Sequence, residues 1–261
     1  MLKNRIIPTL LWKDVGLVKG IRFDSNRRVG SVEQAIRIFN SRDVDELVLL
    51  DITATDQKRD PKYEEILKFG QWTSVPFTIG GGIRSAEQIK NLLNSGADKV
   101  VINTKAYEEP EFIQRVSKIF GAQSIVISID YKLVNGLPFC FSNNGRTNTM
   151  ISLSSWMIKM SQMGAGELLI TSCDKDGTRS GYDIETLQGV SKSIDIPMIA
   201  SGGAGSKQDI KKVFIDTQVS AVAVGSLFQF TEVTPHEIRE HLRLSDIPVR
   251  SAPKHRVGLA K

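Results

Sequence analysis

The sequence predicts a (β/α)8 barrel built from two similar halves. Eight apolar, β-branched runs alternate with segments of helical spacing along 261 residues. The apolar runs are nearly continuous, as is typical of parallel strands that helices cover. Residues 75–84 and 196–205 share one pattern, an apolar run that ends in glycines. Eight strand–helix units with such a twofold repeat favour a closed barrel over a doubly wound open sheet, whose edge strands stay unpaired.

The repeat is exact at several positions. The two members of each pair are 121 residues apart, and the pairs are Pro76 and Pro197, Gly81 and Gly202, Gly82 and Gly203, Ser85 and Ser206, and Ile89 and Ile210. The eight predicted strands are residues 5–11, 46–51, 75–79, 99–103, 124–130, 167–172, 197–201 and 220–224. The clearest helix follows the third strand, where Ser85 and Gln88 form a capping box and Gly96 ends the apolar stripe.

One barrel domain is expected over residues 1–244, followed by a basic tail over residues 245–261. The net charge is +5, but the basic residues are spread along the chain and no aromatic residues interleave with them. A phosphorylated small molecule therefore fits better than a nucleic acid. No apolar run is long enough to span a membrane, and residues 6–12 read as a strand rather than a signal peptide. A cytoplasmic protein is expected.

Cys140 and Cys173 have no metal-ligand spacing, so no metal site or cofactor is predicted. Reduced thiols are favoured over a disulfide, because a single bridge is a thin framework for a chain of this length.

The predicted ligand sites lie at the carboxyl ends of the strands, where barrels of this class carry their chemistry. Glycine pairs follow the third and seventh strands, and short polar steps follow the fourth and eighth: Gly81-Gly82, Gly202-Gly203, Asn103-Thr104 and Gly225-Ser226. Exposed backbone N–H groups at such turns bind phosphate. Two matched sites predict a ligand with a phosphate at each end. The alternative is that these glycines only permit tight turns.

Asp130 ends the fifth strand, where a carboxylate can exchange a proton with a ligand. The position that corresponds to it on the first strand is Leu11, which cannot do so. Asp14 lies on the loop beyond, and Asp51 and Asp176 are the other acids at strand ends. The alternative for Asp130 is a cap on the following turn.

Four strands begin with a charge, two of each sign: Arg5, Glu46, Lys99 and Glu167. Charges that point into a barrel need partners, so a ring of ion pairs at the floor is expected. It could act as a stabilising plug or as a gate.

These features resemble the cyclase subunit of imidazole glycerol phosphate synthase in histidine biosynthesis, from Arg5 to about Leu244. Six stretches carry the resemblance: residues 45–54, 76–83, 96–104, 164–172, 174–183 and 199–205. It implies a barrel that pairs with a glutaminase as a heterodimer, receives ammonia through its floor, and converts phosphoribulosylformimino-aminoimidazole-carboxamide ribonucleotide to imidazole glycerol phosphate and aminoimidazole carboxamide ribonucleotide.

The resemblance also implies roles for individual residues. Arg5, Glu46, Lys99 and Glu167 match the ammonia gate, Asp98 and Gln123 match floor positions near the partner, and Asp130 matches one of two catalytic aspartates. The candidate residues for binding substrate and its phosphates are Lys19, Asp51, Gly82, Asn103, Thr104, Asp176, Gly177, Gly203, Gly225 and Ser226.

The chain departs from the family where Leu11 replaces the other catalytic aspartate, with further changes at Pro8-Thr9, Val15-Gly16 and residues 27–31. This pattern resembles a branch of the family found in surface-polysaccharide gene sets. Members of that branch are thought to channel ammonia to a separate sugar amidotransferase, so cyclase activity could be weak or absent here. A bis-phosphate isomerase of the same barrel superfamily is a third interpretation, which leaves the floor charges unexplained.

Overall fold

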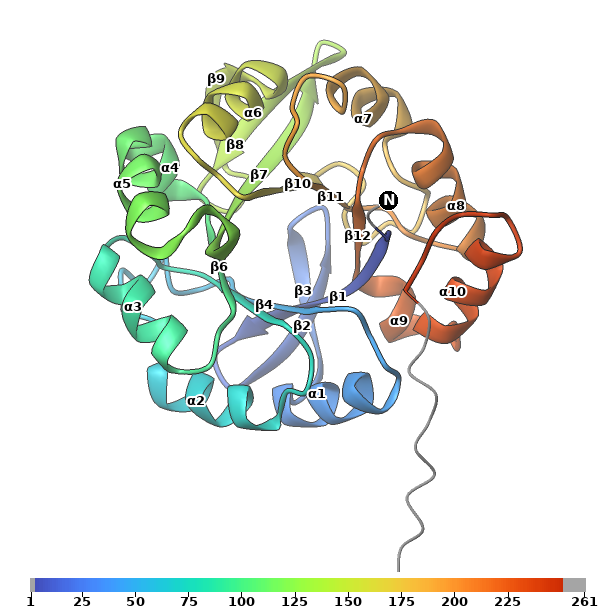
Figure 1. The fold of residues 1–261 in the computed structure, drawn as a ribbon, viewed down its shortest axis with the longest axis horizontal. Helices are drawn as coiled ribbons and strands as arrows, with labels where there is room; N and C mark the ends of the chain where they lie inside the picture. The colour runs from blue at the N-terminus through green and yellow to red at the C-terminus, as the bar shows by residue number, and fades with distance from the viewer. Residues whose placement is uncertain (1–2, 251–261) are drawn as a thin grey trace, which may run out of the picture.

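The structure, a computed structural model, describes residues 3–250 and contains the predicted barrel (Figure 1). Its closed ring of parallel strands is formed by β1 (Arg5–Lys13), β4 (Leu47–Asp51), β5 (Phe77–Gly80), β6 (Lys99–Ile102), β7 (Ile125–Val134), β10 (Glu167–Ser172), β11 (Met198–Ser201) and β12 (Ala221–Val224). β1 pairs with β12 and β4, and β7 pairs with β6 and β10. The ring is therefore closed, and the prediction of a (β/α)8 barrel is confirmed.

Helices surround the ring on its outside (Figure 1). They are α1 (Val32–Ser41), α2 (Tyr63–Trp72), α3 (Ala86–Asn94), α4 (Thr104–Glu108), α5 (Pro110–Phe120), α6 (Leu153–Gln162), α7 (Ile184–Val190), α8 (Lys207–Asp216), α9 (Ser226–Phe230) and α10 (Pro235–Arg243), with a short 3-10 turn η1 (Ala122–Ser124). The capping box of Ser85 and Gln88 starts α3 as predicted, and Gly96 follows its end with φ +96°. Serines also cap α1, α6 and α8.

Two antiparallel hairpins extend the barrel at its mouth and were not predicted. β2 (Gly16–Ile21) and β3 (Asp24–Gly30) follow β1, and β8 (Leu137–Ser142) and β9 (Thr147–Ser152) follow β7. The turn between β7 and β8 is Asn135-Gly136, with φ values of +51° and +80°. Asn-Gly between apolar runs is a strong hairpin signal, so the second hairpin could have been found from the sequence.

Apolar side chains fill the barrel in two separate layers. The larger cluster lies between the strands and the helices and includes Ile6, Leu47, Ile127 and Leu168. A smaller cluster fills the lumen of the barrel and consists of Ile7, Val48, Val101, Val126, Leu169, Ile199, Ala221 and Ala223. We call this second cluster the lumen layer. It follows from the alternation of side chains along each strand, which turns every second residue inward.

The register of the strands supports the twofold repeat. Leu11 of β1 pairs with Leu50 of β4, and Asp130 of β7 pairs with Thr171 of β10. Leu50 and Thr171 are separated by 121 residues, the offset of the sequence repeat. Leu11 and Asp130 are therefore equivalent positions of the two halves.

The described chain continues beyond α10 along the amino end of the barrel. The backbone N–H of Asn4 donates to the carbonyl oxygen of Pro248 at 2.8 Å, and Val249 is buried. Residues 251–261 of the predicted basic tail lie outside the described residues. Cys140 and Cys173 are both buried free thiols, and within residues 3–250 no helix is long and apolar enough to cross a membrane.

Candidate active site

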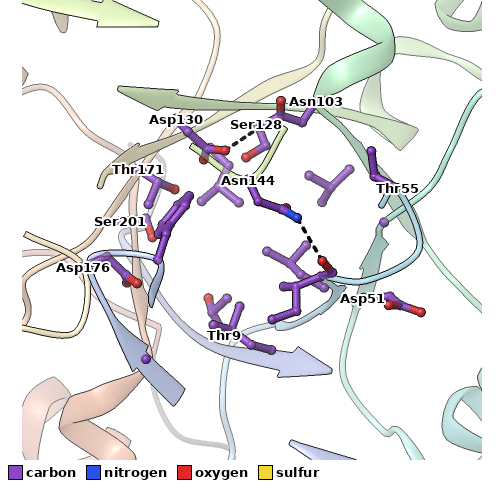
Figure 2. A pocket seen from close by; sticks show the side chains of 18 of the residues that line it. Thr9, Asp51, Thr55, Asn103, Ser128, Asp130, Asn144, Thr171, Asp176 and Ser201 are labelled. Atoms are coloured by element: carbon purple, nitrogen blue, oxygen red, sulfur yellow. Dashed lines mark hydrogen bonds between the residues drawn. The ribbon is translucent and has the colours of Figure 1, made fainter. Parts of the chain in front are cut away.

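The main cavity lies at the mouth of the barrel, at the carboxyl ends of the strands, with a volume of about 660 Å³ (Figure 2). The structure brings the predicted ligand-binding residues together around it: Lys19, Asp51, Gly82, Asn103, Thr104, Asp130, Asp176, Gly177, Gly203, Gly225 and Ser226. Their places in the chain span more than 200 positions. Closure of the barrel is what gathers them.

The two predicted phosphate sites, which we call cradles, lie on different parts of this wall. The first cradle combines Gly81-Gly82 with Asn103-Thr104, and the second combines Gly202-Gly203 with Gly225-Ser226. Gly82 follows β5 and Gly203 follows β11, both with positive φ, +71° and +107°. Thr104 and Ser226 are the first residues of α4 and α9, which follow β6 and β12. At Gly203 a Cβ atom would lie 2.2 Å from the carbonyl oxygen of Gly181, so the backbone can take this course only with glycine.

Replacing Gly203 with alanine is expected to lower the free energy of unfolding by about 1–3 kcal/mol, because the residue is held at positive φ against another backbone. Gly189→Ala is the matched control. That glycine lies inside α7 with open space where its Cβ would be, and the change should stabilise the protein by roughly 0.5–1 kcal/mol. Urea unfolding measures both. Equal effects of the two changes would contradict the assignment of Gly203 to a strained turn.

Asp130 is a buried acid of the cavity and is only 6% exposed. Burial raises the pKa of its carboxyl to about 7, and the negative charge of Asp176 acts in the same direction. The side-chain amide of Asn103 opposes this rise by donating a hydrogen bond to Asp130 at 2.8 Å. An acid with a pKa near neutrality can both give and take a proton under physiological conditions.

Lys19 reaches the cavity from β2. Its ammonium group is buried and donates to the carbonyl oxygen of Thr9 at 2.8 Å, beside Gly225. Burial lowers the pKa of Lys19 to about 8, against the attraction of Asp176. Burial likewise raises the pKa of Asp176. Among the described residues, Lys19 has no carboxylate within ion-pair distance, so its charge is available to an anion at the second cradle.

Asp51 lines the cavity, but the contacts of its carboxylate lie within its own loop. It accepts hydrogen bonds from the backbone and hydroxyl of Thr53, from the N–H of Ala54, and from Arg59 at 2.6 Å. These contacts shape the loop after β4. Asp51 therefore positions the wall of the cavity.

Leu11 lines the cavity at the position equivalent to Asp130. Its neighbour Thr9 also faces the cavity, and the hydroxyl of Thr9 is buried with no hydrogen-bond partner among the described residues. The wall formed by β1 thus has one hydroxyl and no acid.

The four floor charges form the expected closed ring. Arg5 pairs with Glu46 at 2.9 Å and with Glu167, and Lys99 pairs with Glu46 at 3.1 Å and with Glu167 at 2.9 Å. Thr78 adds a hydrogen bond to Glu46 at 2.7 Å. Both glutamates are almost fully buried. The ring closes the lumen at its amino end.

A second cavity of about 320 Å³ lies below this ring and is lined by Arg5, Lys99, Gln123 and Glu167 among others. Asp98 does not line it. Its carboxylate accepts the backbone N–H of Phe77 at 2.7 Å and so fixes the start of β5. Of the two predicted floor positions, Gln123 faces the lower cavity.

Several residues around the main cavity were missed from the sequence. Phe23 comes from the hairpin β2–β3, and Asn143, Asn144 and Arg146 come from the turn between β8 and β9. Asn144-Gly145 is an Asn-Gly step of the kind that favours a hairpin, whereas no short motif marks Phe23. Only prediction of the two hairpins would have brought them to the mouth of the barrel.

Comparison with known proteins identifies the family of the chain. The family model described as "Histidine biosynthesis protein" matches residues 5–234. Proteins named "Imidazole glycerol phosphate synthase subunit HisF" are 43% identical in Endomicrobium trichonymphae, over 96% of both chains, and 43% identical in Lactococcus lactis subsp. cremoris (strain MG1363), over 97% of this chain and 99% of the relative. The protein of that name from Chlorobaculum parvum is 41% identical over 96% of this chain and 100% of its own. The resemblance predicted from the sequence is confirmed, and the chain belongs to the HisF family of imidazole glycerol phosphate synthase subunits.

Proposed function

We propose that this chain is the cyclase subunit of an imidazole glycerol phosphate synthase. It uses ammonia to convert phosphoribulosylformimino-aminoimidazole-carboxamide ribonucleotide to imidazole glycerol phosphate and aminoimidazole carboxamide ribonucleotide. The observation that carries the proposal is one cavity with a glycine cradle at each of two related places and Asp130 in its wall. A ligand with a phosphate at each end fits this arrangement.

Asp130 supplies proton transfer in this proposal. Addition of ammonia to a carbonyl carbon leaves a nitrogen that must lose a proton, and release of the carboxamide fragment requires a proton on its nitrogen. A carboxyl whose pKa is near 7 can perform one of these transfers at a time. The equivalent position on β1 is Leu11, so the other transfer falls to water or to another group of the cavity.

Ammonia reaches this cavity from below. A glutaminase bound at the floor, near Gln123 and Asp98, would release ammonia into the lower cavity. The ring of Arg5, Glu46, Lys99 and Glu167 then acts as the gate, and the lumen layer lies above it. Because an apolar layer disfavours ions far more than small neutral molecules, it would pass ammonia and exclude ammonium.

The direct test is turnover of the bis-phosphate substrate by the purified chain with an excess of ammonium chloride. Formation of both products supports the proposal. The absence of turnover, with ammonia in excess and substrate bound, would contradict the proposal.

Leu11→Asp tests how far the chemistry depends on the missing acid. A positioned acid or base typically contributes about 10²- to 10⁴-fold to a rate. If the chain is an effective cyclase as it stands, we expect Leu11→Asp to raise turnover by less than tenfold, because other groups already carry the second transfer. Leu11→Asn is the control, since it adds polarity without a titratable group. A rise of 10²-fold or more that Leu11→Asn does not share would show that the natural chain is a poor cyclase.

That outcome would favour a second candidate function, delivery of ammonia to another acceptor such as a sugar amidotransferase. The observation in its favour is Leu11 in the wall of the cavity. The relatives named above all carry the name of the synthase subunit and give it no support. An isomerase acting on bis-phosphates would leave the floor ring and lower cavity without a role.

A further inference from the structure

Three loops meet over the main cavity at the turn between β8 and β9. The residues of this turn, Asn143, Asn144 and Gly145, have φ values of +51°, +56° and +72°. At Gly145 a Cβ atom would lie 2.9 Å from the ring of Phe23, so the hairpin β2–β3 rests directly on the turn. The loop after β4 contacts the same turn from another side. The turn is thus held in place by two other loops of the mouth.

The side chain of Asn144 is fixed by this contact. Its amide nitrogen donates to the carbonyl oxygen of Ile52 at 3.0 Å and lies 3.4 Å from a carboxylate oxygen of Asp56. Arg146 forms an ion pair with the other oxygen of Asp56. Both neighbours of the Asn144 amide are acceptors, so only its NH₂ group can face them. Its carboxamide oxygen is left for a donor elsewhere.

Figure 2 shows that Asn144 lies inside the cavity. Asn144 projects into the middle of the view, between Asp130 on one side and the loop of Asp51 on the other. The wall of the barrel below it combines apolar side chains such as Leu11 and Leu169 with hydroxyl groups such as that of Thr171. The two cradles recognise phosphates and carry no information about the part of a ligand that lies between them. Selection of that part requires polar groups such as Asn144.

We propose that Asn144 determines specificity by accepting a hydrogen bond from an N–H group in the part of the ligand between its phosphates. The site would thereby prefer bis-phosphates that carry an amidine, amine or carboxamide over phosphorylated sugars. The inference rests on the proposed function for the identity of the ligand. It adds a residue that binds the nitrogen-containing groups between the two phosphates. In the proposed substrate, the formimino and carboxamide groups supply such donors.

The test compares two ligands on the full chain without ammonia, when the substrate binds but cannot react. The first is the proposed substrate, and the second is ribose 5-phosphate, which has a phosphate and no nitrogen. Asn144→Leu removes the acceptor at nearly constant volume. We expect it to weaken substrate binding about tenfold, as for a typical neutral hydrogen bond, and to leave ribose 5-phosphate binding within twofold.

Asp56→Asn is the matched variant for the turn itself. It removes the ion pair with Arg146 and keeps the acceptor on Asn144, so it should change both affinities by the same factor or by none. Calorimetric titration measures all six dissociation constants. If Asn144→Leu weakened both ligands equally, or neither, the inference would be overturned. A wild-type chain that shows the expected selectivity and yet fails to turn over substrate with ammonia would defeat the proposed function alone.

Discussion

Replacing Asp130 with asparagine is expected to lower cyclase turnover by about 10²- to 10⁴-fold, the usual contribution of a positioned acid or base. The change keeps the volume of the side chain and an oxygen that can accept the hydrogen bond from Asn103. The geometry of the cavity should therefore survive while proton transfer is lost. Asp195→Asn removes an exposed carboxylate and serves as the control for the change in net charge. Turnover within tenfold of wild type would remove Asp130 from the mechanism.

The dependence on pH sharpens this prediction. With a pKa near 7, Asp130 is ionised only above neutrality, and as the acceptor of a proton it should give a rate that rises with pH through 7. The profile is to be measured at a fixed concentration of free ammonia. The residual activity of Asp130→Asn should lack this rise in rate with pH. A wild-type rate that rises near pH 4 instead would contradict the raised pKa of Asp130.

As pH rises through neutrality, the free energy of unfolding should fall while the rate increases. The pKa of Asp130 is raised from 3.8 in the unfolded chain to about 7 in the folded one, so the folded protein binds this proton more tightly. The contribution of the protonated carboxyl to the free energy of unfolding is therefore present below about pH 4 and is lost as pH rises through 7. Asp130→Asn has no such loss. The variant should therefore gain stability relative to wild type between pH 5 and pH 8, as urea unfolding at the two pH values can show.

The second large effect is expected at the floor. Glu46→Gln should lower the free energy of unfolding by roughly 3 kcal/mol, because it leaves Arg5 and Lys99 with a single buried carboxylate between them. The amide of glutamine can still accept the hydrogen bond from Thr78, so the loss reports on charge.

Glu33→Gln is the matched control for Glu46→Gln. Glu33 pairs with Arg37 on the exposed face of α1, where such a pair is worth about 0.5 kcal/mol or less. Urea unfolding of both variants at low and moderate salt compares them. If the two changes cost the same, the floor ring would be no more than a set of surface pairs.

The barrel could be predicted from the sequence because its determinants are local. Each strand is a continuous apolar run, and the glycine turns repeat at one offset, so eight strands and the two cradles follow from patterns of about ten residues. The floor ring could be predicted for the same reason, since a charge at the start of a strand must face its counterparts once the ring closes.

The contacts between the loops that meet over the cavity could not be predicted in this way. Asn144 meets Ile52 across 92 positions of sequence, and neither residue lies in a periodic segment. Asp51 illustrates a different limit. Its place at a strand end predicts its position at the cavity, but not its ion pair with Arg59, eight residues later in the loop. Position in a strand predicts where a side chain begins and leaves its hydrogen-bond partner undetermined.

The twofold repeat has a consequence for how a ligand enters. Two cradles of the same construction would accept a molecule with phosphates at both ends in either direction, and a molecule bound the wrong way round would be an inhibitor of its own reaction. Among the positions at which the halves differ is the equivalent pair Leu11 and Asp130. A preference of about 1.4 kcal/mol between the two directions already gives a tenfold excess of one. An acid on β7 opposite a leucine on β1 therefore makes the two directions of binding unequal, as a perfectly symmetrical barrel could not.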